Sequence, residues 1–292
     1  QHIKGDKTIW AIVAVLVIFS FMPVYSASTN LVYVVGSGST LGYLLKHMVL
    51  LIMGFGIIYG VHKIPYRYFS GGSVLMLPIV IVLLVFTLTQ GTIIGGANAS
   101  RWIRIAGIGF QTSTLASLVL MVYVARYLAK NKEKEINFKE SLLQLWLPVA
   151  AVLILILPAN FSTTAIIFVM VLTVTFIGGY PLKYLGFILG VGILALVFFV
   201  LIAKAFPDAM PNRVQTWQNR IENFSDSENK EAYQVEKAKI AIATGGPLGV
   251  GPGKSVQKNF LPQSSSDFIF AIIIEEYGLL GGVLIVFIYF LL

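Results

Sequence analysis

Long apolar segments recur along the whole chain, separated by short polar or basic stretches. A helix that crosses the hydrocarbon core of a bilayer needs roughly 17–25 mainly apolar residues. We therefore expect about eight membrane-spanning helices, at Ile9–Ser26, Leu44–Val61, Ser73–Thr89, Thr112–Leu128, Leu142–Leu157, Thr163–Gly178, Tyr184–Ala203 and from Phe268 to Leu292. The predicted fold class is all-α, a polytopic helical membrane protein.

One polar stretch, residues 204–266, interrupts this pattern. Structureless loops of this length are uncommon and usually functional. Its middle, SENKEAYQVEKAKIAIATGG, has apolar residues at helical spacing before a glycine stop, which predicts an amphipathic helix at the outer interface. The glycine-rich GGPLGVGPGKSVQKNF follows, and such a backbone can present N–H groups to an anion. We expect residues 1–292 to form a single transmembrane domain, with 204–266 as its large extracytoplasmic loop.

The basic residues of the short loops predict the orientation, because such residues concentrate on the cytoplasmic side. With the N-terminus inside, the cytoplasmic segments hold Lys4, Lys7, Lys63, Arg67, Arg126, Lys130, Lys132, Lys134, Lys139 and Lys183. The short outer loops hold Arg101 and Arg104, with Lys46 at a helix edge. We therefore expect a multi-pass protein of the cytoplasmic (inner) membrane, with both ends of this chain on the cytoplasmic side.

Composition narrows the partners and cofactors. Only 12% of the residues are charged, whereas a soluble domain has about 25%. The net charge of +8 is explained by lysines and arginines beside membrane segments, so we expect membrane lipids as partners and no nucleic acid. The absence of cysteine excludes disulfides and thiolate metal sites, and the three histidines show no ligand spacing.

The acidic residues point to one end of the last apolar segment. None lies in the first seven expected spans, yet Glu275 and Glu276 lie in the eighth and Asp267 lies at its start. A carboxylate within a membrane is costly unless it is paired, protonated or facing a wet cavity. Helical spacing puts Asp267 and Glu275 on roughly one side, with Glu276 about 100° away. We expect one glutamate to face a site cavity and the other to bind a structural partner.

Three motifs carry a resemblance to a known family: GANASRWIRIAGIGFQTS, YQVEKAKIAIATGGPLGVGPGKSVQKNFLP and DFIFAIIIEEYGLLGG. Over nearly its whole length the chain resembles the SEDS family (shape, elongation, division and sporulation), which contains RodA, FtsW and SpoVE. VQKNFLP favours the FtsW, or cell-division, branch. The family has ten spans, of which this chain would contain eight.

The resemblance implies a peptidoglycan glycosyltransferase that polymerises glycan strands from lipid II outside the cytoplasmic membrane. It implies a class B penicillin-binding protein and other division proteins as partners, undecaprenyl-linked glycan as substrate and undecaprenyl pyrophosphate as leaving group. The family's catalytic aspartate falls on Asp267, which would act as general base. The alternative reading of Asp267 is a helix N-cap, a role that Ser264, Ser265 or Ser266 could also fill.

The remaining site residues follow from the same motifs and from the chemistry of phosphate binding. Basic and polar residues predicted to bind the substrate are Arg101, Trp102, Arg213, Tyr233, Gln234, Lys239, Lys254 and Lys258. Residues predicted to support the site are Glu275, Glu276, Gln111 and Ser113. Each of the substrate-binding predictions has an alternative: the loop lysines could be merely solvated, Trp102 could anchor the chain at the membrane interface, and Tyr233 and Gln234 could pack the loop helix. We expect a divalent cation, Mg²⁺ or Mn²⁺, although the sequence shows no dedicated site for it.

The chain departs from the family pattern: where the family has F-Q-P-S-E-x-x-K, this chain has FQTSTLAS. Thr112, Thr114 and Ser117 replace proline, glutamate and lysine, and Asn160 stands where the family usually has an acid. Any role of that lysine cannot carry over. Two alternative functions therefore remain open: a lipid II flippase, and an inactive scaffold that recruits a penicillin-binding protein.

Overall fold

The computed structural model describes residues 5–35, 39–90, 93–94, 97–98, 102–105, 108–205, 230–261 and 264–292. The chain divides into two compact units, one made of Gln1–Ile64 with Asn223–Leu292 and the other of Pro65–Glu222. Each is described by itself.

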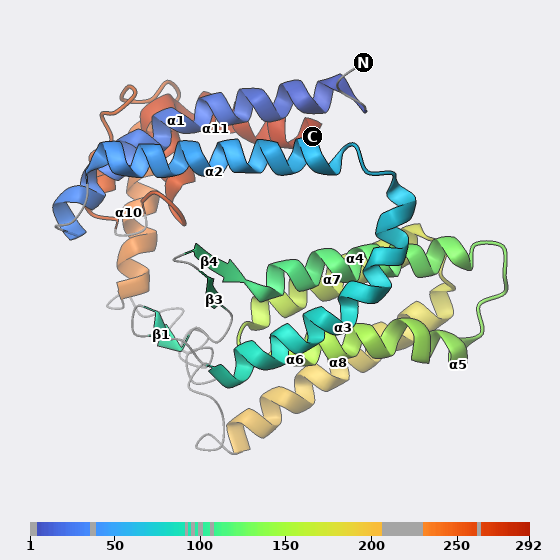
Figure 1. Ribbon diagram of the computed structural model, residues 1–292. Coiled ribbons are helices and arrows are strands. Elements are labelled where there is room, and N and C mark those ends of the chain that lie inside the picture. The colour runs from blue at the N-terminus through green and yellow to red at the C-terminus, as the bar shows by residue number, and fades with distance from the viewer. Residues whose placement is uncertain are drawn as a thin grey trace. The chain divides into compact units, whose positions relative to one another are not determined.

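The first unit combines helices from both ends of the chain. Its elements are α1 (Lys7–Val35), α2 (Thr40–Val61), α10 (Lys230–Gly245), the 3₁₀ helix η4 (Gln257–Asn259) and α11 (Ile269–Leu291). Helix α1 packs against both α2 and α11, and α10 packs against α11, as Figure 1 shows in blue, orange and red. The predicted amphipathic helix of the polar stretch is therefore present as α10.

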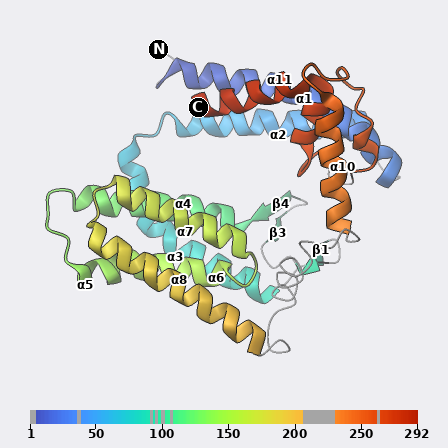
Figure 2. The same cartoon turned by 180° about the vertical axis from the view of Figure 1, so that it is seen from behind.

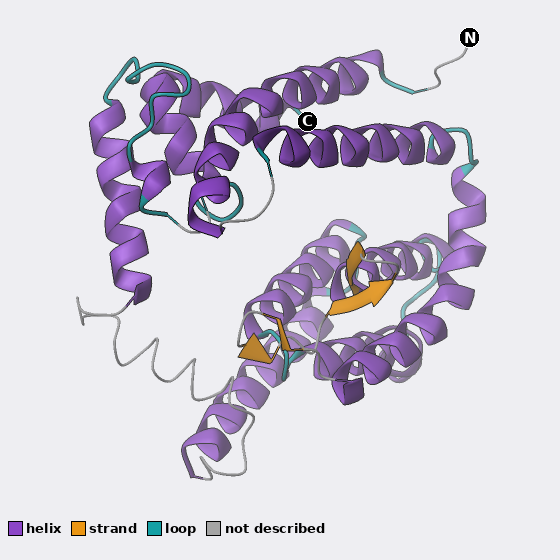
Figure 3. Cartoon of the chain, turned by 60° about the vertical axis from the view of Figure 1, so that its left-hand side comes forward, coloured by secondary structure: helices purple, strands orange, loops and turns teal. Residues whose placement is uncertain are grey.

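The second unit is a helical bundle with short strands at one end. Its elements are α3 (Tyr66–Gln90), β1 (Ile93–Ile94), β2 (Ala97–Asn98), β3 (Trp102–Ile105), β4 (Ile108–Gln111), α4 (Thr112–Lys130), α5 (Phe138–Ser141), the π-helix η1 (Leu142–Trp146), α6 (Leu147–Ile156), α7 (Phe161–Ile177) and α8 (Leu182–Ala205). Strands β3 and β4 form an antiparallel hairpin, with Trp102 opposite Gln111, that leads into α4 (Figure 3). Helix α4 packs against α3, α6 and α7, and Figure 2 shows these helices together in one bundle.

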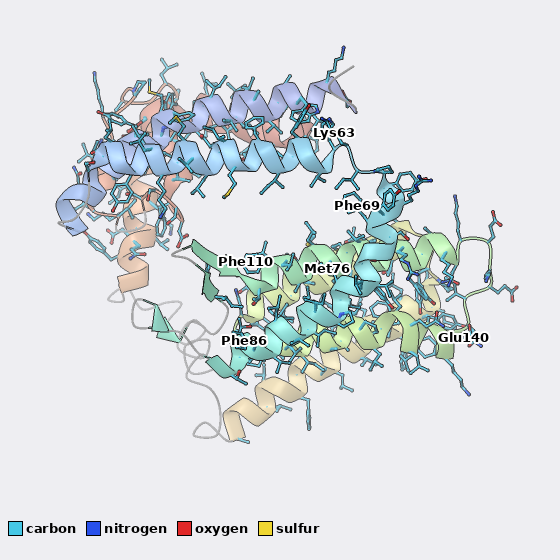
Figure 4. The ribbon with its side chains drawn as sticks, viewed as in Figure 1. Lys63, Phe69, Met76, Phe86, Phe110 and Glu140 are labelled. Carbon is cyan, nitrogen blue, oxygen red and sulfur yellow. The ribbon has the colours of Figure 1, made fainter. Side chains whose placement is uncertain are left out.

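The core of the second unit is aliphatic. Its most completely buried side chains come from α4, α6 and α7 and include Leu120, Val124, Val149, Val152 and Val171. In a bilayer, such contacts stabilise through close packing, because lipid tails are as apolar as leucine. Along α3, Phe69 and Phe86 are exposed whereas Met76 is partly buried against this core (Figure 4).

A proline explains how the π-helix is tied to α4. Pro148 has no N–H, so the carbonyl of Gln144 four residues earlier loses its helical donor. That carbonyl instead accepts a hydrogen bond from the Tyr123 hydroxyl on α4, at 2.5 Å. The turn between α7 and α8 is fixed nearby: the buried Tyr180 hydroxyl bonds the Ser141 hydroxyl at 2.7 Å and accepts from the Trp146 indole at 3.1 Å.

The predicted all-α membrane fold is confirmed. Among the described residues, six helices are long and apolar enough to cross a membrane, and two apolar helices, Phe161–Ile177 and Leu182–Phe198, are shorter. Every segment predicted to span is helical, and most ends agree within a few residues. Helix α2 has no buried residue within its span, in keeping with a surface of lipid-facing side chains.

Candidate functional site

Asp267 lies in the turn directly before α11 and is exposed. The N-cap of α11 is Phe268, whose side chain makes no capping hydrogen bond, so the N-cap position considered for Asp267 and its neighbouring serines is wrong. Its carboxylate makes no hydrogen bond or ion pair with the described residues. Because the apolar span begins at Ile269, this carboxylate stands just beyond the end of the span, available to a ligand.

Glu275, two turns into α11, is fully buried, with 0% of its surface exposed. Its carboxylate accepts a hydrogen bond from the Ser255 hydroxyl, and others from the backbone N–H groups of Val256 at 3.0 Å and Gln257 at 3.3 Å. The glycine-rich loop was predicted to offer N–H groups to an anion. The anion that these three donors hold is the protein's own Glu275.

Glu276 is buried as completely and turns toward α1. It accepts a hydrogen bond from the Ser26 hydroxyl of α1 and one from the Ser255 N–H at 3.4 Å. Both glutamates are therefore engaged with structural partners, and the expectation that one of them faces a site cavity stays a prediction. The hydroxyl and N–H donors to Glu275 and to Oε1 of Glu276 offset part of the cost of placing two carboxylates inside a membrane span, while Oε2 of Glu276 is buried without a partner among the described residues.

Lys258 joins the same cluster. Its ammonium donates to the Ser26 hydroxyl oxygen at 3.1 Å and to the Gly253 carbonyl at 2.9 Å. The cluster made of Ser26, Ser255, Lys258, Glu275 and Glu276, here called the glutamate cluster, links α1, the loop and α11.

Gly278 breaks α11 just after the two glutamates, with φ +73° and ψ 179°. In an unbroken helix, the N–H groups of residues 279 and 280 would donate to the carbonyls of residues 275 and 276. Here those carbonyls accept from Val250 at 2.9 Å and Gly251 at 3.0 Å, while Leu279 and Leu280 donate to the loop carbonyls of residues 246 and 247. The kink thus exchanges two helical hydrogen bonds for four bonds to the loop, which satisfies the four backbone groups that the break frees, as a bilayer demands.

Two glycines permit this close approach, one at the end of α10 and one in the loop that follows it. A Cβ on Gly245 would lie 2.1 Å from the Ile274 carbonyl oxygen, and one on Gly249 would lie 2.3 Å from that of Glu276. Only a residue without a side chain fits at either position, so the GG-x-x-G spacing of the loop has a direct steric reason.

The other predicted site residues are distributed between the two units. On α10, Tyr233 is exposed and Gln234 is half-buried, and the ammonium of Lys237 lies 5.2 Å from the Tyr233 ring centroid. Lys239 and Lys254 are exposed. In the second unit, the Gln111 amide donates to the Ser113 hydroxyl at 3.0 Å, and Trp102 pairs with Gln111 across the hairpin. Arg101 and Arg213 lie outside the described residues.

Ser26 and Ser255 were not predicted as site residues. Each is a single serine in an unremarkable local context, and Ser26 meets Glu276 across 250 positions of sequence. No pattern within either segment indicates that contact.

The described residues contain no group of three or more metal-ligating side chains. The oxygens of Glu275 are already taken by N–H and O–H donors and Glu276 is buried, whereas the exposed carboxylate of Asp267 could contact a divalent ion. One carboxylate fits Mg²⁺ bound mainly by phosphate oxygens and water.

Two hollows lie in the second unit. An apolar groove of about 420 Å³ runs between α7 and α8, lined by Leu172, Thr173, Phe176, Leu182, Leu185, Gly186 and Leu189. A second hollow of about 420 Å³, lined by both charged and apolar residues, lies where α4 ends and α8 begins. The apolar groove is of the lateral kind that a lipid chain could enter.

A family model described as cell cycle protein (FtsW, RodA and SpoVE) matches residues 6–292. A probable peptidoglycan glycosyltransferase FtsW of Alcanivorax borkumensis is 30% identical over 289 residues, covering 98% of this chain and 73% of the relative. Another, of Nitrosomonas europaea, is 28% identical over 302 residues, covering 100% of this chain and 74% of the relative. The chain thus spans about three quarters of the length of these relatives.

Two solved structures share the fold. A chain from a peptidoglycan synthase complex, described as coordinating polymerization and crosslinking, superposes with a TM-score of 0.66 at 23% identity, covering 98% of this chain and 75% of that one. The rod shape determining protein RodA of Thermus thermophilus superposes with a TM-score of 0.62 at 21% identity, covering 98% and 72%.

Proposed function

We propose a function from one premise, that this chain belongs to the FtsW, RodA and SpoVE family of cell cycle proteins. The proposed function is that of a peptidoglycan glycosyltransferase of the inner membrane, which polymerises glycan strands from lipid II at the septum, on the extracytoplasmic side. Relatives named as peptidoglycan glycosyltransferases across nearly all of this chain support it. The observation that carries it is the carboxylate of Asp267, which is exposed at the end of a membrane span and makes no hydrogen bond or ion pair with the described residues.

The proposed reaction needs one base. The C4 hydroxyl oxygen of one sugar attacks C1 of another, the C4–O–C1 bond forms, and the bond from C1 to the pyrophosphate oxygen breaks. The hydroxyl proton goes to Asp267, and undecaprenyl pyrophosphate leaves with the electron pair. Because the leaving group is already a stable anion, no second carboxylic acid need protonate it, and the configuration at C1 inverts.

Glu275 is held inside the protein by three donors, which suits a supporting role. The network around it fixes the loop to the first half of α11, from which Asp267 projects. Rigid support of a catalytic group within about 0.5 Å is a general requirement of active sites. Glu276, Ser26 and Lys258 extend the same support to α1, so we assign Lys258 to this cluster rather than to the substrate.

For the pyrophosphate, we propose the other basic residues predicted above: Arg101, Arg213, Lys239 and Lys254. Arginine suits bidentate contacts with phosphate oxygens. Trp102, Tyr233 and Gln234 remain proposed substrate contacts, with Gln111 and Ser113 supporting the hairpin. A divalent cation would be held mainly by pyrophosphate oxygens, with Asp267 as its one proposed protein ligand. There it would neutralise the charge of the leaving group. The apolar groove between α7 and α8 is a candidate path for an undecaprenyl chain.

A class B penicillin-binding protein is the proposed partner, supported by the fold shared with a chain of a peptidoglycan synthase complex. A scaffold that only recruits this partner is the second candidate. One observation favours it: at the position of the family's charged pair in α4, the Ser117 hydroxyl bonds the Thr114 carbonyl of its own helix at 2.8 Å, and no charge is present.

The test is glycan synthesis by the purified full-length protein with its partner, lipid II and a divalent metal. We expect glycan chains from the wild type, none from Asp267→Asn or Asp267→Ala, and wild-type amounts from Glu236→Gln. Glu236 is a matched control because it is an exposed acid on α10. Chains made by Asp267→Asn would refute the proposed base. Lipid II flipping that survives Asp267→Ala without polymer would indicate a transporter, and neither activity in the wild type would indicate the scaffold.

A further inference from the structure

The hollow at the end of α4 and the start of α8 has a basic rim. Its lining includes Lys132, Lys134 and Lys183, with Asn131, Tyr184 and a single acid, Glu135. Three cations and one carboxylate give this rim a formal charge of +2. All three lysines are exposed, and their ammonium groups make no hydrogen bond or ion pair with the described residues. The rim is therefore able to take an anion.

Hydrogen bonds fix the walls of this hollow. Asn131 ends α4, with its side-chain amide donating to the Tyr127 carbonyl at 2.9 Å. The opposite wall is the turn at Gly178 and Gly179, where Gly179 has φ +77° and the next residue, Tyr180, is held by its two side-chain bonds. Figure 1 shows the α4–α5 connection and the α7–α8 turn at the same end of this bundle. The hollow is thus formed before any ligand arrives.

The start of α8 adds backbone donors. The N–H groups of Tyr184 and Leu185 both donate to the Pro181 carbonyl, at 3.0 and 3.1 Å. The N–H groups of Leu182 and Lys183 precede them in the first turn, where a helix offers no internal acceptor. Such N–H groups, at the positive end of the helix dipole, favour a phosphate.

Exposed apolar side chains border the hollow. Helix α7 ends with Ile177, which is 77% exposed, and α8 begins with Leu182, which is 67% exposed. Exposed apolar side chains on both sides of the turn indicate that the hydrocarbon region reaches this point. The distribution of lysine and arginine assigns this end to the cytoplasmic leaflet, whose surface carries anionic lipids.

We propose that this hollow, called here the lysine pocket, binds the phosphate headgroup of an anionic phospholipid of the inner leaflet. Lipid is favoured over an acidic protein segment because exposed apolar residues border the pocket, so a lipid can keep its chains in the bilayer while its phosphate contacts Lys183. Each lysine near an anionic membrane contributes about a fivefold gain in affinity. Removing all three should weaken binding on the order of 100-fold.

The test compares two triple variants of the full chain in detergent micelles. The pocket variant carries Lys132→Gln, Lys134→Gln and Lys183→Gln. The control carries Lys7→Gln, Lys130→Gln and Lys139→Gln, which removes the same charge from the same predicted side without touching the pocket lining. Binding of phosphatidylglycerol and of phosphatidylcholine is measured by native mass spectrometry, with thermal unfolding as the check on folding.

We expect the wild type and the control to retain phosphatidylglycerol over phosphatidylcholine, and the pocket variant to lose that preference at unchanged melting temperature. Glu135→Gln raises the rim charge from +2 to +3 and should tighten binding about fivefold. Equal losses in both triple variants would overturn the proposal, because they would show diffuse attraction. Three other results would also overturn it: the protein retains the two lipids equally, inorganic phosphate at equal concentration displaces the lipid, or the pocket prefers a soluble polyglutamate peptide.

Discussion

Replacing Gly278 by alanine tests whether the kink in α11 is a steric requirement. With φ +73° and ψ 179°, Gly278 occupies a backbone region that is essentially restricted to glycine, and another residue there costs about 1–3 kcal/mol. The added Cβ would also lie 2.3 Å from the Pro247 oxygen and 2.5 Å from the Gly249 nitrogen. Both are backbone atoms that cannot rotate away, and overpacking adds about 1–3 kcal/mol. We expect Gly278→Ala to destabilise the protein by about 2–6 kcal/mol.

Thermal unfolding of the purified protein in detergent measures this loss. At about 2–4 °C per kcal/mol, the melting temperature should fall by at least about 4 °C. The matched control is Gly54→Ala in α2, where a Cβ meets nothing within 4 Å and the helical backbone favours alanine by up to about 1 kcal/mol. If both variants melt within about 1 °C of the wild type, the reasoning from backbone geometry and contact is refuted.

Three further sets of substitutions probe named hydrogen bonds, each by thermal unfolding. Ser255→Ala removes one donor from a buried carboxylate and should lower the free energy of unfolding by about 1–3 kcal/mol. Its control, Ser117→Ala, loses a bond only to its own helix and should change stability by less than about 0.5 kcal/mol. Equal effects of the two substitutions would contradict the importance of the buried cluster. Tyr180→Phe loses two partners and should cost about 1–3 kcal/mol; an unchanged melting temperature would show that these bonds add nothing. Asn160 caps α7, because its side-chain oxygen accepts a hydrogen bond from the Thr163 N–H at 3.3 Å. Asn160→Ala should therefore destabilise the protein by about 1 kcal/mol, whereas Asn160→Asp should be neutral or stabilising by about 0.3–1 kcal/mol. The reverse order of stability would refute the capping role.

The helices could be predicted from sequence because each depends on a local property, the length of an apolar run. The expected span Leu44–Val61 is found within α2, and Thr112–Leu128 within α4. The ends were less certain because polar residues can extend a helix beyond the membrane, as in α1, which continues to Val35. The π-helix η1, which precedes α6, was not predicted, since its Gln144 carbonyl bonds the Tyr123 hydroxyl of α4, a contact made only in the folded bundle.

The glutamate cluster could be predicted only in part. The cost of two carboxylates in an apolar segment correctly indicated that they need partners. Which partners they have depends on tertiary contacts between α1, the loop and α11, and local spacing carries no information about these. For the same reason, the sequence could not indicate that Glu275 itself accepts the hydrogen bonds of the loop's N–H groups. Nor could it indicate that Gly278, rather than Gly281 or Gly282, has the positive φ.

The bond between Ser26 and Glu276 has a consequence for biogenesis. Ser26 lies in α1 and is synthesised before Glu276, which lies in α11 and enters the bilayer only after the helices between them. Until α11 is inserted, α1 lacks its α11 partner and the Glu276 carboxylate that its Ser26 hydroxyl bonds. The first unit is therefore completed only once α11 has been made, and a chain released before that point would leave α1 without this anchor.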